Sequence, residues 1–151
     1  KDFGLAFSKS QIAAGNSLPT KGLAFISLKD KHKNEGIELA KKLIKLNFKL
    51  CGTIGTAEYF NSKGVKCKKI NKVNQGSPHI VDVLNAKKIA LVINTGGGNS
   101  ENQLSDAVAL RRATLINKVP YCTNMSTAYV CMEGIKSLKS KKITVTSLQD
   151  I

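Results

Sequence analysis

Two almost wholly apolar runs constrain the fold of this chain most strongly. They are residues 23–28 (LAFISL) and 89–93 (IALVI). A strand with no alternation of apolar and polar residues must be covered on both faces, which is typical of a parallel sheet between layers of helices. Further strands are expected at 48–51, 65–70, 119–122 and 143–145, and helices at 3–14, 36–46, 57–60, 78–84, 105–116 and 127–135. This alternation predicts an α/β fold with helices on both faces of the sheet.

The length and the apolar content of the chain predict one core. With 151 residues and 42% hydrophobic residues, the chain is too short for two ordinary domains. It begins at Lys1 rather than at methionine, so we expect a processed or excised piece of a larger protein. No apolar run reaches the roughly 18 residues of a membrane span, and no leader pattern is present. We therefore expect no membrane partner.

The four cysteines indicate a reducing compartment. They show no C-x-x-C spacing and lie in apolar contexts, which is typical of buried, reduced thiols. The expected location is the cytoplasm, and no metal site is expected.

The charge of the chain favours anionic partners. Lys and Arg number 24 against 10 Asp and Glu, a formal net charge of +14. This balance suits nucleic acid, an anionic surface or phosphorylated small molecules. However, the lysines are dispersed, aromatic residues make up only 5%, and tryptophan is absent, so the stacking surface of a single-strand binder is missing. We expect a solvated lysine-rich surface and no nucleic-acid partner, with an RNA-binding module as an alternative.

The turn TIGTAEYF, residues 53–60, is the strongest local signal for a binding site. Thr53 and Thr56 lie three positions apart with Gly55 between them, where a short apolar strand meets the start of a helix. A helix N-terminus offers unpaired N–H groups and a positive dipole potential, and so binds anions such as phosphate. An ordinary threonine N-cap is the simpler interpretation of the turn alone.

Polar groups also follow the other predicted strands. Ser27 and the lysine-rich residues 29–33 follow the first strand, residues 71–72 the third and residues 94–96 the fourth. Because ligands of parallel sheets bind beyond the carboxyl ends of the strands, these groups are expected to converge with the threonine turn. Hydroxyls, ammonium groups and free N–H groups together predict a site for a nucleotide phosphate and its sugar.

Four further residues are candidates for roles at or near the site. His79 is expected to be a capped or core histidine, and His32 a solvated side chain. Asp82 and Asp106 are the carboxylates that the pattern places closest to the cleft, where either could cap a helix, pair with a lysine or meet a partner domain.

The motifs SLKDKHK, CGTIGTAEYF, INKVNQGSPHIVDVL, LVINT and RRATLINKVPYCTN, in this order, resemble the methylglyoxal-synthase-like domain at the carboxyl end of the carbamoyl-phosphate synthase large subunit. The resemblance implies a Rossmann-like or flavodoxin-like parallel sheet of about five strands. It implies that residues 1–20 form a connecting helix from the preceding synthetase domain, and that residues 21–151 form a regulatory domain. This domain is not catalytic in the family, whereas the parent enzyme is an ATP- and Mg-dependent ligase that makes carbamoyl phosphate for arginine and pyrimidine synthesis.

The resemblance also implies partners and site residues. The expected partners are a nucleoside monophosphate (uridine or inosine monophosphate), the rest of the large subunit and the small glutaminase subunit, with an oligomer of the parent enzyme left open. No cofactor is expected in the domain itself. Thr123 falls where the family contacts ornithine. The phosphate residues would be Lys33, Thr53, Thr56 and Lys72, and the ribose or base residues Ser27, Asn94 and Thr95.

The chain departs from the family pattern around the base site. Gly96 stands where relatives often carry a hydroxyl, the loop GGGNSENQ replaces a more basic one, and Ile54 replaces a more polar residue. A lyase of the methylglyoxal synthase type is an alternative function. It needs a carboxylate base, which that enzyme takes from the loop after the third strand, and residues 74–78 contain no acid here. The Lys-Thr-Leu-His-Pro run of the related cyclohydrolases is absent as well.

Overall fold

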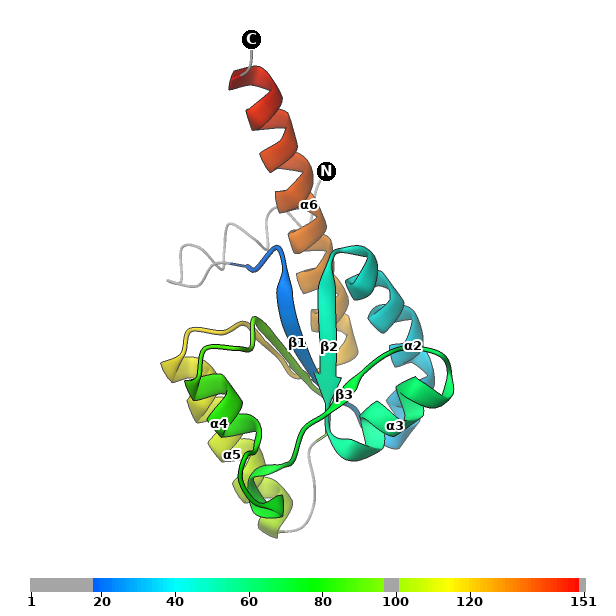
Figure 1. The fold of residues 1–151 in the computed structure, drawn as a ribbon, viewed down its shortest axis with the longest axis vertical. Coiled ribbons are helices and arrows are strands. Elements are labelled where there is room, and N and C mark those ends of the chain that lie inside the picture. The colour runs from blue at the N-terminus through cyan, green and yellow to red at the C-terminus, as the bar shows by residue number, and fades with distance from the viewer. Residues whose placement is uncertain (1–17, 97–100, 150–151) are drawn as a thin grey trace.

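The structure is a computed structural model that describes residues 18–96 and 101–149, and its centre is a five-stranded parallel sheet (Figure 1). Every pair of neighbouring strands is parallel, in the order β3-β2-β1-β4-β5. The strands are β1 (Gly22–Ser27), β2 (Phe48–Gly52), β3 (Lys68–Lys69), β4 (Leu91–Asn94) and β5 (Tyr121–Cys122). The predicted α/β class and the predicted sheet of about five parallel strands are therefore confirmed.

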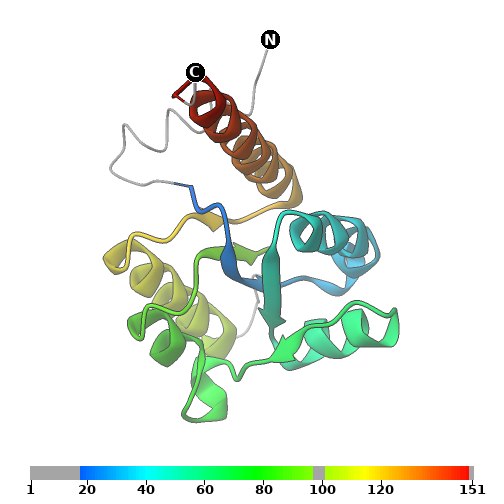
Figure 2. The same cartoon turned by 45° about the horizontal axis from the view of Figure 1, so that its top comes forward.

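Helices cover both faces of this sheet, as predicted (Figure 2). They are α2 (Asp30–Lys45), α3 (Ile54–Ser62), α4 (Ile80–Asn85), α5 (Glu101–Ile116) and α6 (Met125–Gln149), with a 3-10 turn η1 (Val73–Gln75). Ala24 and Ile26 of β1 face the layer of α2, α3 and α6, whereas Phe25 faces α4 and α5. All three side chains are at most 1% exposed, which explains why β1 is apolar throughout.

Helix α2 begins at Asp30, six residues before the predicted helix at 36–46. Its first two turns (DKHKNE) are polar and carry no apolar periodicity, so the pattern revealed only the part that packs on the core. The correction matters for the site, because it moves Lys33 from a loop onto the first turn of a helix.

Three predicted elements are shorter or begin later than expected. The predicted strand at 65–70 is paired only at Lys68–Lys69, and that at 119–122 only at Tyr121–Cys122. Both are edge strands, which have one neighbour to pair with. Pro78 precedes α4 by two residues rather than lying in its first turn.

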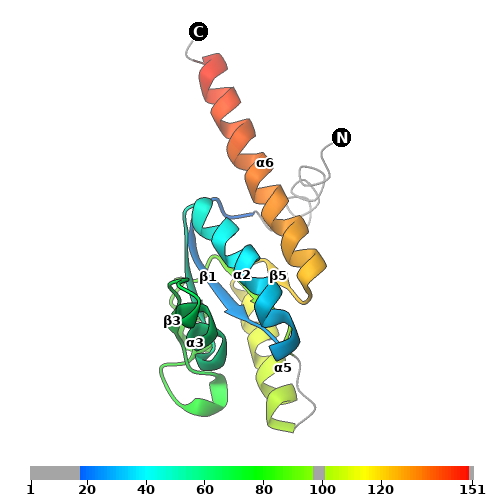
Figure 3. The same ribbon diagram turned by 90° about the vertical axis from the view of Figure 1, so that its right-hand side faces the viewer.

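The predicted strand at 143–145 is wrong, because these residues belong to α6. Their β-branched side chains favour strands only weakly, and α6, predicted at 127–135, continues through them (Figure 3). Two contacts tie α6 to α2: Lys139 donates from Nζ to the carbonyl oxygen of Leu46, and Lys42 Nζ lies 5.7 Å from the ring centre of Tyr129. The predicted helix at 3–14 lies outside the described residues, so the connecting helix at 1–20 stays a prediction.

Among the residues that the structure describes, no helix is both long enough and apolar enough to cross a membrane.

Candidate functional site: a cleft at the carboxyl ends of the strands

A cavity of about 380 Å³ opens at the carboxyl ends of β1, β2 and β4. The chain runs from β1 outward to β2 and β3 and then returns to the other side of β1 as β4, so the strand order reverses between β1 and β4. Ligands of open parallel sheets bind at such a reversal point. Polar residues that line the cavity are Ser27, Lys29, Asp30, Lys33, Thr53, Thr56, Lys72, Gln75, Asn94 and Asp106.

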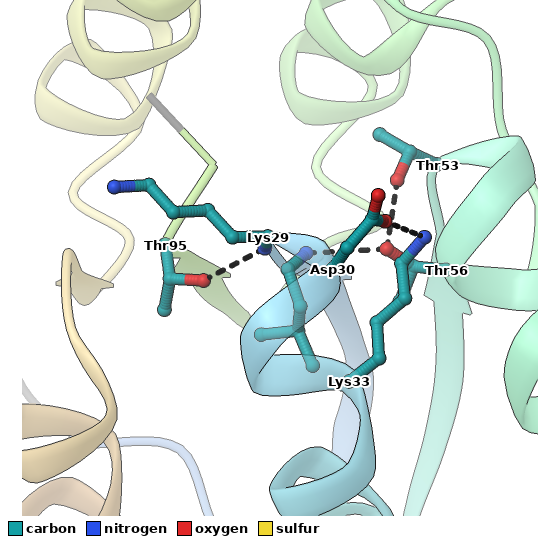
Figure 4. Close-up of polar contacts among 7 residues, drawn as sticks. Lys29, Asp30, Lys33, Thr53, Thr56 and Thr95 are labelled. Atoms are coloured by element: carbon teal, nitrogen blue, oxygen red, sulfur yellow. Dashed lines mark hydrogen bonds and ion pairs between the residues drawn. The ribbon is translucent and has the colours of Figure 1, made fainter. Parts of the chain in front are cut away.

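Two buried threonine hydroxyls form the floor of the cleft at the start of α3. Thr53 Oγ1 donates to Thr56 Oγ1 at 3.0 Å, and the backbone N–H of Leu28 donates to the same Thr56 oxygen at 3.1 Å (Figure 4). Thr56 thus accepts two hydrogen bonds and keeps its own proton to donate. Thr53 occupies the N-cap position of α3 but makes no side-chain cap hydrogen bond, so the turn is not an ordinary threonine cap.

The ammonium group of Lys33 lies beside these hydroxyls. It pairs with Asp30 at 2.8 Å between Nζ and Oδ1, and the Asp30 side chain is 96% exposed (Figure 4). Hydrogen bonding to Lys33 and its positive charge lower the pKa of Asp30, so this carboxylate is ionised at neutral pH. Lys33 Nζ also lies 3.3 Å from the point where a Cβ on Gly55 would stand, so the glycine leaves the space that the ammonium occupies.

Lys72 and Asp106 line the cavity from other elements. Lys72 precedes η1, and its backbone N–H donates to Gln75 Oε1 at 2.7 Å, which orders the turn around it. Asp106 projects from α5, and its Oδ2 atom is buried without a hydrogen-bond partner among the described residues. A buried carboxylate oxygen without a protein donor is open to a hydrogen bond from water or from a ligand in the cleft.

Asn94 closes the cleft at the end of β4. It is 9% exposed and stands in register beside Ser27 of β1. Its Oδ1 accepts the backbone N–H of Gly96 at 3.1 Å, and its Nδ2 donates to Tyr121 Oη at 3.3 Å. One Nδ2 hydrogen and one Oδ1 lone pair remain for a ligand.

Thr95 does not line the cavity. Its hydroxyl accepts the backbone N–H of Lys29 at 3.1 Å (Figure 4). The same oxygen lies 3.1 Å from His32 Nδ1, and the two contacts hold the start of α2 against the end of β4. His32 is half-buried on α2, so the expectation of a solvated side chain was wrong; its lysine-rich neighbourhood concealed this contact.

The remaining candidates do not line the cavity. Thr123 is exposed on the segment after β5. Asp82 caps α4, because its Oδ2 accepts the backbone N–H of His79 at 3.0 Å, and this hydrogen bond lowers the Asp82 pKa. His79 itself occupies the N-cap position of α4 and is half-buried, but its Nδ1 atom has no hydrogen-bond partner among the described residues, so the prediction of a capped or core histidine is not confirmed. The structure thus gathers six of the eight predicted site residues around one cavity: Ser27, Lys33, Thr53, Thr56, Lys72 and Asn94.

Within the described part of the chain, no group of three His, Cys, Asp or Glu side chains could hold a metal ion. The four cysteines are buried and free. Burial raises the pKa of Cys51 to about 12 and that of Cys67 to about 11, so both thiols are protonated at neutral pH.

Fold and cleft together define an α/β domain with a cavity lined by hydroxyl and ammonium groups at the carboxyl edge of its sheet. Comparison with known families identifies the domain further: the family model described as "MGS-like domain" matches residues 35–123. The chain belongs to this family.

Curated relatives extend the similarity over the whole chain. It is 44% identical over 156 residues to the carbamoyl phosphate synthase large chain, C-terminal section, of Aquifex aeolicus, and 40% identical over 151 residues to that of Methanopyrus kandleri. It is 42% identical over 150 residues to the carbamoyl phosphate synthase large chain of Mesorhizobium japonicum. These alignments cover 99–100% of this chain, but only 29%, 28% and 13%, respectively, of the relatives.

A solved structure shows the same fold. Methylglyoxal synthase from Elizabethkingia anophelis NUHP1 superposes with a TM-score of 0.61 at 18% sequence identity, and the match covers 76% of this chain and 79% of that one. At this level of sequence identity the comparison supports a shared fold and gives no information about activity.

Proposed function

We propose that the chain is the regulatory section of a carbamoyl phosphate synthase large chain, and that its cleft binds a nucleoside monophosphate effector. The parent enzyme would be an ATP- and Mg-dependent ligase, partnered by a small glutaminase subunit. This domain would have no catalytic step of its own, and ornithine near Thr123 would be a second effector. The relatives named for carbamoyl phosphate synthase support the first part of this proposal.

The convergence of two hydroxyls and two lysines on one cavity carries the effector proposal. Thr53 and Thr56 come from the start of α3, Lys33 from α2, and Lys72 from the segment before η1. These groups supply O–H and ammonium donors beside a helix N-terminus, the combination that best holds a phosphate dianion. Three segments distant in sequence would thus contribute to one anion site.

The rest of the cavity suits a nucleoside. From β2 the strand ends pass through Ser27 of β1 to Asn94 of β4, so a ligand whose phosphate lies on Thr56 would extend toward Asn94. The unpartnered oxygen of Asp106 would accept a hydrogen bond from a ribose hydroxyl. Val73, Ile80 and Leu110 supply apolar lining for a base.

Regulation requires that the nucleotide bind one state of the parent enzyme more tightly than the other. The effector would then shift the ligase between these states by the ratio of the two affinities.

One observation favours a second candidate function, a lyase acting on dihydroxyacetone phosphate. Proton abstraction beside a carbonyl needs a positioned carboxylate, and Asp106 supplies one within the same cavity as the proposed phosphate groups. Turnover of dihydroxyacetone phosphate by the wild-type chain, lost in Asp106→Asn, would establish the lyase and replace the proposal of a non-catalytic domain.

The deciding experiment is calorimetric titration of the chain with uridine and inosine monophosphate at low and moderate salt. We expect saturable one-to-one binding that distinguishes the two bases. Equal affinity for the two nucleotides, with a steep loss of binding as salt is raised, would contradict the proposal and favour the RNA-binding alternative.

A further inference from the structure

Tyr121 lies one strand beyond the cavity, and its hydroxyl reaches Asn94, which lines the cleft. Strand β5 consists of two residues, and Tyr121 pairs with Val92 of β4. The Tyr121 side chain packs against the apolar layer of α4 and α5, and Oη accepts the 3.3 Å hydrogen bond from Asn94 Nδ2. Tyr121 does not line the cavity itself.

The hydrogen bonds of Asn94 fix the orientation of its carboxamide. The backbone nitrogen of Gly96 can only donate, so the atom that faces it must be the oxygen Oδ1. The Nδ2 atom therefore faces Tyr121 Oη, which accepts. Among the described residues, the tyrosine hydroxyl is the partner that holds the Nδ2 end of Asn94.

This orientation also shapes the turn that leaves β4. A Cβ on Gly96 would lie 3.5 Å from both Asn94 Oδ1 and Ser27 Oγ, so the three residues are packed closely at this end of the cleft. The contacts run from Tyr121 through Asn94 to Gly96, and none of them involves the threonine and lysine groups proposed to hold the phosphate.

We infer that Tyr121 is a positioning residue for the nucleoside end of the cleft. It orients the Asn94 carboxamide and the Gly96 turn, and so sets affinity for the ribose and base without contacting the ligand. This inference rests on the proposed nucleotide site.

Tyr121→Phe tests it, because the substitution removes only the hydroxyl. We expect affinity for uridine monophosphate to fall about threefold to tenfold, the effect of one hydrogen bond, while affinity for inorganic phosphate stays unchanged. When Asn94→Ala is already present, adding Tyr121→Phe should change the affinity for uridine monophosphate little. The matched control is Tyr59→Phe, which removes another hydroxyl, bonded to Asn34 Oδ1 at 3.4 Å on an exposed surface outside the cavity.

The outcomes separate this inference from the proposed function. Unchanged nucleotide affinity in Tyr121→Phe, or an equal loss for nucleotide and phosphate, would overturn the positioning role. If the wild type binds no nucleotide, the proposed function fails, and the NMR signals of the Gly96 amide and of the Asn94 side-chain amide decide the inference. Signals that shift in Tyr121→Phe but not in Tyr59→Phe support it, and unmoved signals overturn it.

Discussion

The hydroxyl of Thr53 donates to the hydroxyl of Thr56 across 3.0 Å, and both side chains are at least 93% buried. A second donor, the Leu28 N–H, reaches Thr56 from β1's end, so one oxygen joins the carboxyl end of β1 to the start of α3. The same group is therefore part of the fold and of the proposed phosphate site.

This double role predicts two effects of Thr56→Ala. The Leu28 N–H would lose its acceptor in a buried place, and the free energy of unfolding should fall by about 1 to 3 kcal/mol. Nucleotide affinity should fall as well, because the substitution also removes the Thr56 hydroxyl proton that would donate to the phosphate. Urea unfolding and calorimetry measure both quantities, and Thr56→Ser, which keeps the hydroxyl, should retain most of each. Wild-type affinity in a folded Thr56→Ala chain would exclude this hydroxyl from the site.

Lys72→Ala separates binding from folding. The side chain makes no ion pair within the described residues and lines the cavity, so its loss should lower nucleotide affinity about tenfold with little change in unfolding free energy. Lys66→Ala changes the net charge equally at an exposed site outside the cavity and serves as the control. Equal losses in the two variants would indicate a general effect of charge rather than a specific contact.

Asp30→Asn should strengthen phosphate binding. Asp30 forms an ion pair with Lys33 and places a negative charge at the cavity. Its neutralisation should therefore raise nucleotide affinity about twofold to fivefold. Glu38→Gln, on the same helix and outside the cavity, should leave affinity unchanged. Lower affinity in Asp30→Asn would show that the carboxylate helps to hold the ligand or positions Lys33.

The lowered pKa of Asp30 sets the pH range in which its carboxylate competes with a phosphate for Lys33. Because Lys33 lowers that pKa below 3.8, the carboxylate is ionised throughout pH 5–8, and its ion pair is lost only as pH falls through the lowered value. The affinity ratio of Asp30→Asn to wild type should therefore be constant from pH 7 to 8, above the second phosphate pKa of about 6. If this affinity ratio changes within the range, a group other than Asp30 titrates there and affects binding.

Gly55→Ala should move stability and binding in opposite directions. Alanine favours the helix and should stabilise the chain by about 0.5 to 1 kcal/mol. Its methyl group would stand 3.3 Å from Lys33 Nζ and displace the ammonium, so nucleotide affinity should fall. Gly36→Ala is the contrasting case: its Cβ would meet Leu28 Cδ1 at 2.3 Å, and it should destabilise the fold. Thermal unfolding and calorimetry of both variants check this pair of expectations.

The buried cysteines predict alkaline instability. Burial raises the pKa of Cys51 to about 12 and that of Cys67 to about 11, above the ordinary thiol value. A raised pKa stabilises the folded chain fully below the pKa of the unfolded thiol, and this contribution is lost as pH rises through about 9 to 12. Unfolding free energies at pH 7 and pH 10 should differ accordingly, with a smaller difference in Cys67→Ala. Rapid labelling of native thiols at pH 8 would contradict their burial.

Sequence alone determined the α/β class, the parallel sheet and most of the groups that meet at its carboxyl edge. The short apolar runs at β1 and β4 favour strands of a sheet covered on both faces, and the carboxyl ends of parallel strands share one edge. Local periodicity failed where tertiary contacts decide. It placed the start of α2 six residues late, because the polar first turns have no apolar face, and it assigned a strand at 143–145, where helix α6 continues.

The roles of individual side chains within the cleft were decided only by the tertiary structure. Thr95 and Asn94 are adjacent in sequence, but Thr95 turns its hydroxyl to Lys29 and His32, while Asn94 lies at the cavity and bonds to Tyr121. Asp106 enters the same cavity from α5, 12 positions after Asn94. Hydrogen-bond partners 27 to 66 residues apart depend on strand order and register, and no spacing within one segment encodes them.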